Sequence, residues 1–147
     1  MPAAQIISTA DLELALAAPA PVDEVLAADA EAPRRARQLI DALDGCCLPP
    51  ARMSDVFVAI SEAVTNVVLH AYGPGRTGRL HLKAWALDNT LAVLIADDGC
   101  GFDPGSAFRS ERTGLGLGLS LMRTVATEMS VVSLPGAGAR VLMIFRP

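Results

Sequence analysis

The stretch "LAVLIADDG", residues 91–99, constrains the fold more than any other part of this chain. It is apolar almost without interruption until Asp97, and a short run of this kind predicts a strand buried on both faces. The segment before it, "RLHLKAWAL" at residues 79–87, alternates between apolar and polar side chains, and the intervening "DN" predicts a turn. Together the two segments predict a β-hairpin inside a sheet.

Three helices are predicted around this hairpin. The first runs from Asp29, its N-cap, to Gly45, its stop. The second begins at Ser54 or a residue just before it, after a proline-marked loop, and runs to about Tyr72, where "GPG" ends it. The third covers residues 117–130 and carries one apolar stripe along its length. The members of that stripe are Leu117, Leu121, Val125 and Met129.

Three further strands are predicted at residues 22–28, 131–134 and 140–146, the last two joined by the turn "PGAGA". Strands in hairpins with helices between them predict an α/β (α+β) two-layer sandwich. In it, one mixed, mostly antiparallel sheet is covered on one face by three helices. Residues 21–147 then form a single domain, and the Ala- and Pro-rich residues 1–20 are expected to be a flexible arm.

The composition limits the classes of partner. The chain is 52% hydrophobic and 19% charged, which excludes a disordered protein, and its net charge of −4 comes without a basic block that would follow a nucleic-acid backbone. No apolar run approaches the roughly 18 to 20 residues of a membrane span, and the N-terminus lacks the basic and apolar regions of a signal peptide. We therefore expect a cytoplasmic protein that binds neither nucleic acid nor membrane.

Three cysteines are present, at Cys46, Cys47 and Cys100, and no CxxC or Cys/His spacing accompanies them. Free cysteine usually behaves as a small hydrophobic residue. We expect reduced structural thiols, with a redox or metal role as the alternative.

A narrow polar stripe on the second predicted helix is the first candidate site. On a helical wheel, Asp55, Glu62, Asn66 and His70 fall on one line between two apolar sides. Burying a carboxylate without a partner is costly, so this stripe predicts a wet cleft or a bound ligand beside it. The alternative is an exposed strip that happens to hold Glu, Asn and His.

Two glycine-rich segments supply further candidates. In "IADDGCGF" a buried strand ends at Asp97, which is followed by Gly99 and Gly101. This pattern suits a site where the backbone approaches a planar ligand and the carboxylate accepts a hydrogen bond from that ligand. The alternative is an ordinary DG turn.

In "RTGLGLGLSLM" every second residue is a glycine up to the start of the third helix, where free N–H groups and the helix dipole favour binding of a phosphate. The alternative is a flexible loop. These glycines are Gly114, Gly116 and Gly118.

Taken in order, E-x-x-x-N-x-x-x-H-A-Y, D-x-G-x-G and T-G-x-G-x-G resemble the N box and the two glycine boxes of the GHKL (Bergerat-fold) ATPase and kinase superfamily. The segment "SEAVTNVVLHAY" and the short spacing before "TGLGLGLSLM" resemble the sequences of the anti-sigma factor serine kinases of the RsbW type. The resemblance implies a Bergerat ATP-binding fold from about residue 22 onward. The lid of about a dozen residues between the glycine boxes argues against a sensor histidine kinase core.

The resemblance also implies roles for the candidate residues. Asn66 supplies an oxygen to the Mg²⁺ that bridges the phosphates of ATP, Glu62 is the general base, and Asp97 accepts the adenine amino group. The nucleotide-binding set is completed by Gly99, Gly101, Thr113, Gly114, Gly116 and Gly118. His70 is expected to have a structural role rather than a nucleotide contact. Arg109 and Arg112 reach a phosphate or a partner, or are solvated lid charges.

The function that the resemblance implies is that of a serine/threonine protein kinase and anti-sigma factor. Such a protein phosphorylates a STAS-type antagonist, sequesters a sigma factor and forms a homodimer. The alternative is a nucleotide-dependent binding module without catalysis, since the sequence shows no substrate.

Overall fold

The computed structural model describes residues 17–46, 48–87, 89–109 and 114–147. Five strands form one sheet in the order β1-β2-β3-β5-β4. Every neighbouring pair is antiparallel, so the sheet that was expected to be mixed contains no parallel pair among the described strands. The predicted hairpin is β2-β3, and its apolar strand β3 is the central strand. The strands are β1 (Val22–Ala27), β2 (Arg79–Leu87), β3 (Thr90–Asp97), β4 (Glu128–Ser133) and β5 (Ala139–Phe145).

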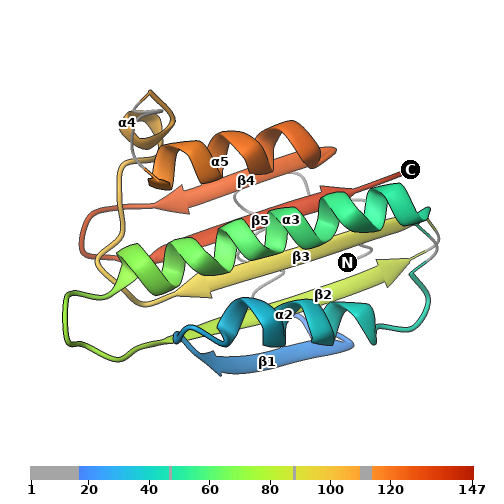
Figure 1. Cartoon of the computed structure of the whole chain (residues 1–147), viewed down its shortest axis with the longest axis horizontal. Coiled ribbons are helices and arrows are strands. Elements are labelled where there is room, and N and C mark those ends of the chain that lie inside the picture. Colours follow the sequence, from blue (N-terminus) through green and yellow to red (C-terminus); the bar gives the residue numbers. More distant parts are fainter. Residues whose placement is uncertain (1–16, 47, 88, 110–113) are drawn as a thin grey trace.

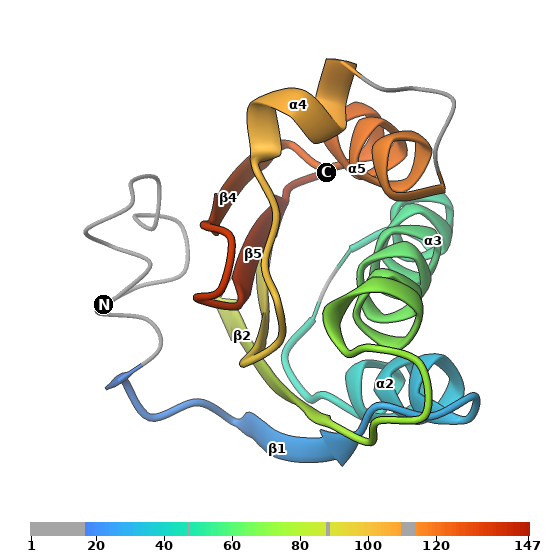
Figure 2. The same cartoon turned by 90° about the vertical axis from the view of Figure 1, so that its left-hand side faces the viewer.

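Helices α2, α3 and α5 lie on one face of this sheet, with α4 beside α5 at the β4 edge, which confirms the two-layer sandwich (Figures 1 and 2). Figure 1 shows α2, α3 and α5 side by side across the strands. One short helix, α4, was not predicted; it begins after Asp103, whose carboxylate accepts from the Gly105 N–H at 3.1 Å and from the Ser106 hydroxyl at 3.0 Å. The helices are α2 (Ala32–Asp41), α3 (Pro50–Asn66), the π-helical turn η2 (Val67–Ala71), α4 (Pro104–Arg109) and α5 (Gly114–Val125).

Helix α3 forms the centre of the core. Its residues Val56, Ile60 and Val64 recur every four positions and are fully buried against the sheet. With η2 it makes a continuous helix, Pro50–Ala71, whose length and hydropathy alone would suit a membrane span. The buried face identifies it instead as the core helix of this domain.

The first turns of α2 and α3 differ from the prediction. Helix α3 begins at Pro50, not at Ser54, because Pro49 is extended and a proline fits the first helical turn, where no N–H is needed. Within the helix the Ser54 hydroxyl donates to the Pro50 carbonyl. In α2 the N-cap is Glu31 rather than Asp29, although the Asp29 carboxylate accepts from the Glu31 N–H at 2.9 Å.

The third predicted helix is shorter than expected, and its predicted apolar stripe is wrong. Helix α5 ends at Val125, and Met129 pairs with Met143 as part of β4. Leu117 and Leu121 are exposed, so the buried face of α5 is a different one. Its members are Leu119 and Met122. Pairing with β5 overrides the helical pattern beyond residue 125.

The face of the sheet away from the helices carries a second, smaller apolar cluster around Trp85, against which Ala18 and Ala20 pack. Trp85 donates its indole N–H to the Pro19 carbonyl at 2.9 Å, and the buried Lys83 ammonium donates to the Ala18 carbonyl. The part of the predicted arm that the structure describes is therefore held on this face (Figure 2).

Candidate functional site

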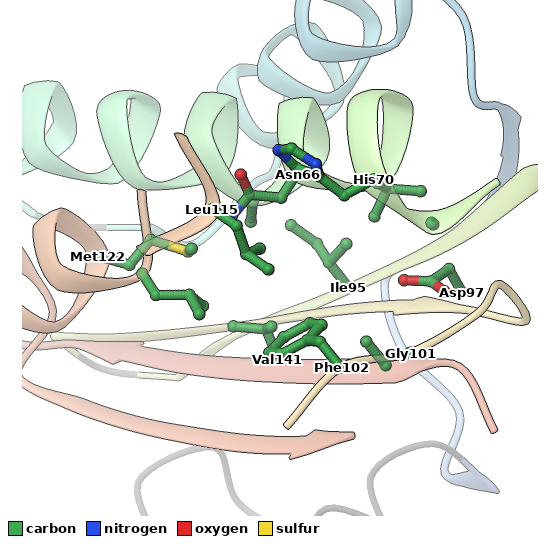
Figure 3. A pocket seen from close by; sticks show the side chains of 14 residues that line it. Asn66, His70, Ile95, Asp97, Gly101, Phe102, Leu115, Met122 and Val141 are labelled. Carbon is green, nitrogen blue, oxygen red and sulfur yellow. The ribbon is translucent and has the colours of Figure 1, made fainter. Parts of the chain in front are cut away.

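A pocket opens between α3 with η2, the start of α5 and the end of β3 (Figure 3). The volume of the pocket, including the part of it that is open to solvent, is about 600 Å³. Its walls are mostly apolar, with Asn66, His70 and Asp97 as the polar side chains that line it. The apolar walls include Ile95, Phe102, Leu115, Met122 and Val141. The structure thus brings the first and second candidate motifs to one cavity.

Asp97 stands at the last position of β3, and its carboxylate points into the pocket (Figure 3). One oxygen, Oδ1, accepts from the Gly99 N–H at 2.8 Å. Burial raises the pKa of Asp97 above its ordinary value, against the lowering effect of hydrogen bonds from the Gly99 and Ala139 backbone. This half-buried carboxylate can accept one further donor from a ligand in the pocket.

The structure shows why glycines are needed at two positions after Asp97, and the sequence did not indicate this reason. A Cβ at Gly99 would lie 2.1 Å from the Ala71 carbonyl oxygen, and one at Gly101 would lie 2.0 Å from that of Leu134. Gly101 also has a φ of +67°, which L side chains rarely adopt. Both glycines let the loop pack on neighbouring protein backbone, and Gly101 also lines the pocket.

Glu62 and Asn66 face α5 at Gly118. A Cβ at Gly118 would lie 3.0 Å from Glu62 Oε2 and 3.1 Å from Asn66 Nδ2. The glycine repeat therefore meets the polar stripe of α3, and a side chain at position 118 would require Glu62 or Asn66 to shift by a few tenths of an ångström. Gly116 is buried in the same helix, which begins at Gly114.

The Asn66 side chain carries a buried nitrogen, Nδ2, without a hydrogen-bond partner in the described part of the chain. Buried polar groups are normally paired, so an orphan at this position marks a place where a ligand is expected. An amide oxygen is a suitable donor to Mg²⁺, which needs few protein ligands when phosphates supply others. No cluster of three or more His, Cys, Asp and Glu side chains among the described residues is placed to hold a metal ion by itself. The residues present therefore fit a magnesium ion carried by a nucleotide.

The remaining candidates have different surroundings. Asp55 belongs to an ion pair, 2.7 Å from Arg52, at the other end of α3, so it is not part of the pocket. His70 is exposed on η2 and lines the pocket. Thr113 and Arg112 lie outside the described residues, and Arg109 is described only as the last residue of α4.

Among the cysteines, Cys46 and Cys100 are free thiols, while Cys47 is outside the described residues.

Several residues that shape the pocket were not among the candidates. Phe102 and Leu115 form part of its walls, and Tyr72 and Ser133 hold the loop after β3 from outside. Their partners are far away in the sequence, and no spacing pattern could have indicated them.

The antiparallel sheet, its layer of helices and the pocket between α3, α5 and β3 define a class of fold, that of the histidine kinase-like ATPases. The sequence matches the histidine kinase-like ATPase domain over residues 26–145. The chain belongs to this GHKL family.

Two relatives assign the chain to the branch of the anti-sigma factor serine kinases within this family. It is 35% identical over 98 residues to an "Anti-sigma F factor" of Caldanaerobacter subterraneus subsp. tengcongensis, a match covering 62% of this chain and 68% of that protein. It is 33% identical over 91 residues to the "Serine-protein kinase RsbW" of Bacillus subtilis, covering 54% of this chain and 56% of the relative.

A solved structure supports the fold alone. The histidine kinase domain of the Erythrobacter litoralis EL346 blue-light activated histidine kinase superposes with a TM-score of 0.56 at 21% identity. The match covers 76% of this chain and 56% of that one.

Proposed function

We propose that this protein is an ATP-binding serine/threonine protein kinase and anti-sigma factor. One observation carries the proposal: Glu62, Asn66 and Gly118 meet beside a pocket whose far end is the carboxylate of Asp97. At one end, this arrangement offers a carboxylate that can recognise a nucleobase. It offers a potential proton acceptor and a metal ligand at the other.

In this proposal the adenine lies in the apolar part of the pocket and donates its amino group to Asp97. Gly99 and Gly101 shape the loop beside it. The phosphates lie toward the start of α5, where the first turn of a helix offers free N–H groups and a partial positive charge. Thr113, Gly114, Gly116 and Gly118 are the residues of that segment.

Asn66 would hold the Mg²⁺ that accompanies ATP. When bound, this ion supplies neutralisation of the charge on the phosphates. The support is the buried amide nitrogen of Asn66, which has no hydrogen-bond partner among the residues that the structure describes. Because the two ends of an amide differ only by a flip about its last bond, the same side chain can direct its oxygen to a cation.

Glu62 would act as general base. The substrate hydroxyl loses its proton to the Glu62 carboxylate as its oxygen bonds to the γ-phosphorus of ATP, and the bond from phosphorus to the ADP oxygen breaks. Gly118 leaves room for this carboxylate beside α5, since a side chain there would press on Oε2.

The proposed partners are a STAS-type antagonist that presents the hydroxyl and a sigma factor that the protein sequesters, with the protein acting as a cytoplasmic homodimer. The names of two relatives, an anti-sigma F factor and a serine-protein kinase, support the kinase and anti-sigma roles. The net charge of −4 supports protein partners rather than nucleic acid. We propose residues 21–147 as the functional domain and residues 1–20 as an arm.

The test is phosphate transfer from radiolabelled ATP to a purified STAS-domain protein. We expect the wild type to label the substrate, and Glu62→Gln to lose transfer by about a hundredfold or more while it still binds ATP. Glu24→Gln, on the exposed edge of β1, is the matched control and should transfer like the wild type. Equal transfer by Glu62→Gln would remove the base assignment. ATP binding without transfer by the wild type would favour the non-catalytic module.

A further inference from the structure

Tyr72 joins three segments that meet beside the pocket. It follows η2 directly, with an extended backbone that ends the helix. Its hydroxyl donates to the Arg79 carbonyl at the start of β2 and lies 3.4 Å from the Asp98 nitrogen, whose N–H donates to it. One side chain therefore connects the end of the α3 helix with β2 and with the turn after β3.

The ring of Tyr72 occupies a space that only glycine leaves open. A Cβ at Gly78 would lie 2.2 Å from the ring carbons Cε2 and Cζ, which is an impossible contact. The Gly78 carbonyl accepts from the Ala28 N–H at 2.9 Å, so this residue is fixed from its other side as well. The ring is consequently held against backbone that is itself anchored.

The turn that Tyr72 contacts is the one that carries the Asp97 carboxylate. Asp98 donates to the Tyr72 hydroxyl, and Gly99 donates to Asp97 Oδ1 at 2.8 Å. The next residue, Cys100, donates its N–H to the Ala71 carbonyl at 2.7 Å. Two adjacent residues at the end of the helix therefore hold two of the three residues that follow Asp97.

We propose that Tyr72 is a positioning residue that fixes the Asp97 carboxylate for recognition of the exocyclic amino group of adenine. This inference rests on the proposed ATP binding. Without the hydroxyl, the Asp98 N–H loses its acceptor in the described structure, and the hold of the helix end on this turn passes through Cys100, while Ser133 still accepts from the Phe102 N–H. The carboxylate then aims less well at the base, while the phosphate end of the pocket, formed by α3 and α5, is unchanged.

The experiment compares two ligands on two proteins by calorimetry. Wild type and Tyr72→Phe are titrated with ATP and with inosine triphosphate, which has the same phosphates but no exocyclic amino group. We expect Tyr72→Phe to bind ATP about three- to tenfold more weakly, the size of one hydrogen bond, and to bind inosine triphosphate as the wild type does. The preference for ATP therefore falls by that same factor.

A matched control separates positioning from general destabilisation. Trp85→Phe also removes one hydrogen bond from an aromatic side chain to a backbone carbonyl, but on the opposite face of the sheet. Its preference for ATP should equal that of the wild type. If Tyr72→Phe weakens the binding of both ligands equally, or leaves ATP binding unchanged, the positioning role is overturned while the proposed function stands. A wild type that binds no ATP overturns the proposed function and this inference with it.

Discussion

Gly118 of α5 lies directly against Glu62 of α3, so that a Cβ at position 118 would be 3.0 Å from Glu62 Oε2. The same added atom would be 3.1 Å from Asn66 Nδ2. Contacts of this length are tighter than a carbon atom normally accepts, so a larger residue would displace the polar side chains that we assign to chemistry. The glycine repeat therefore has a packing role beside the site as well as its proposed role at the phosphates.

Gly118→Ala should damage catalysis more than folding. The methyl group needs a shift of a few tenths of an ångström in Glu62 or Asn66, and we expect phosphate transfer to fall about tenfold because reaction rates depend steeply on such positions. Leu121→Ala, an exposed change in the same helix, is the control. The measurement is transfer from labelled ATP together with the melting temperature. Unchanged transfer in Gly118→Ala would contradict the placement of Glu62 at the reaction.

Asn66→Ala should remove the magnesium dependence of ATP binding. Wild-type affinity is expected to rise when Mg²⁺ is added, and that of the variant to be the same with and without the ion, as measured by calorimetry. Because Asn66 Nδ2 is buried without a partner in the described ranges of the chain, the change should not lower the free energy of unfolding. Asn89→Ala, at the exposed β2-β3 turn, is the control for loss of an amide. A magnesium effect that survives in Asn66→Ala would count against the metal assignment.

Asp97 should make stability depend on pH. Burial raises its pKa in the folded protein above the ordinary value of 3.8, so the folded state holds the proton more tightly than the unfolded state. Between 3.8 and the raised pKa the free energy of unfolding therefore falls as the pH rises. Asp97→Asn has no such titration, and its stability relative to the wild type should increase with pH across that window. Urea unfolding at several pH values measures it; a difference that does not change with pH would contradict the raised pKa.

Arg52 should stabilise the end of the molecule away from the pocket. It donates to the Val125 and Arg146 carbonyls, each at 2.8 Å, and pairs with Asp55 at 2.7 Å. Arg52→Ala leaves these partly buried acceptors unpaired, so we expect about 2 to 3 kcal/mol less stability in urea unfolding.

The matched control is Arg34→Ala, which breaks an exposed ion pair with Glu31 and should cost no more than about 0.5 kcal/mol. Equal losses in the two variants would show that Arg52 is no more than a surface charge. ATP binding should be unchanged in both, since neither residue lines the pocket.

The sequence predicted those parts of the fold that local patterns control. The apolar run of β3, its alternating partner β2 and the helical period of α3 gave the right elements. Where the chain's long-range pairing competes with local pattern, the prediction was wrong: Met129 has helical spacing from Leu121 and Val125, yet it pairs with Met143 in the sheet. Exposed Leu117 shows the same limit, because periodicity alone does not say which side of a helix meets the core.

The candidate site was predictable to the extent that its residues share one element or one loop. Glu62 and Asn66 stand one helical turn apart, and Gly99 and Gly101 follow Asp97 directly. That Gly118 would face Glu62 could not be predicted, because it depends on how α3 and α5 pack. The ring of Tyr72 on Gly78 depends likewise on the shape of the loop between them.

Nucleotide binding in this pocket is tested by a calorimetric titration of the wild type and Asp97→Ala with ATP and ADP, with and without Mg²⁺. We predict nucleotide binding in roughly the micromolar range by the wild type and its loss in Asp97→Ala, while Glu62→Gln still binds. Absence of binding at millimolar nucleotide, or equal binding by Asp97→Ala, would contradict the assignment of this pocket to ATP.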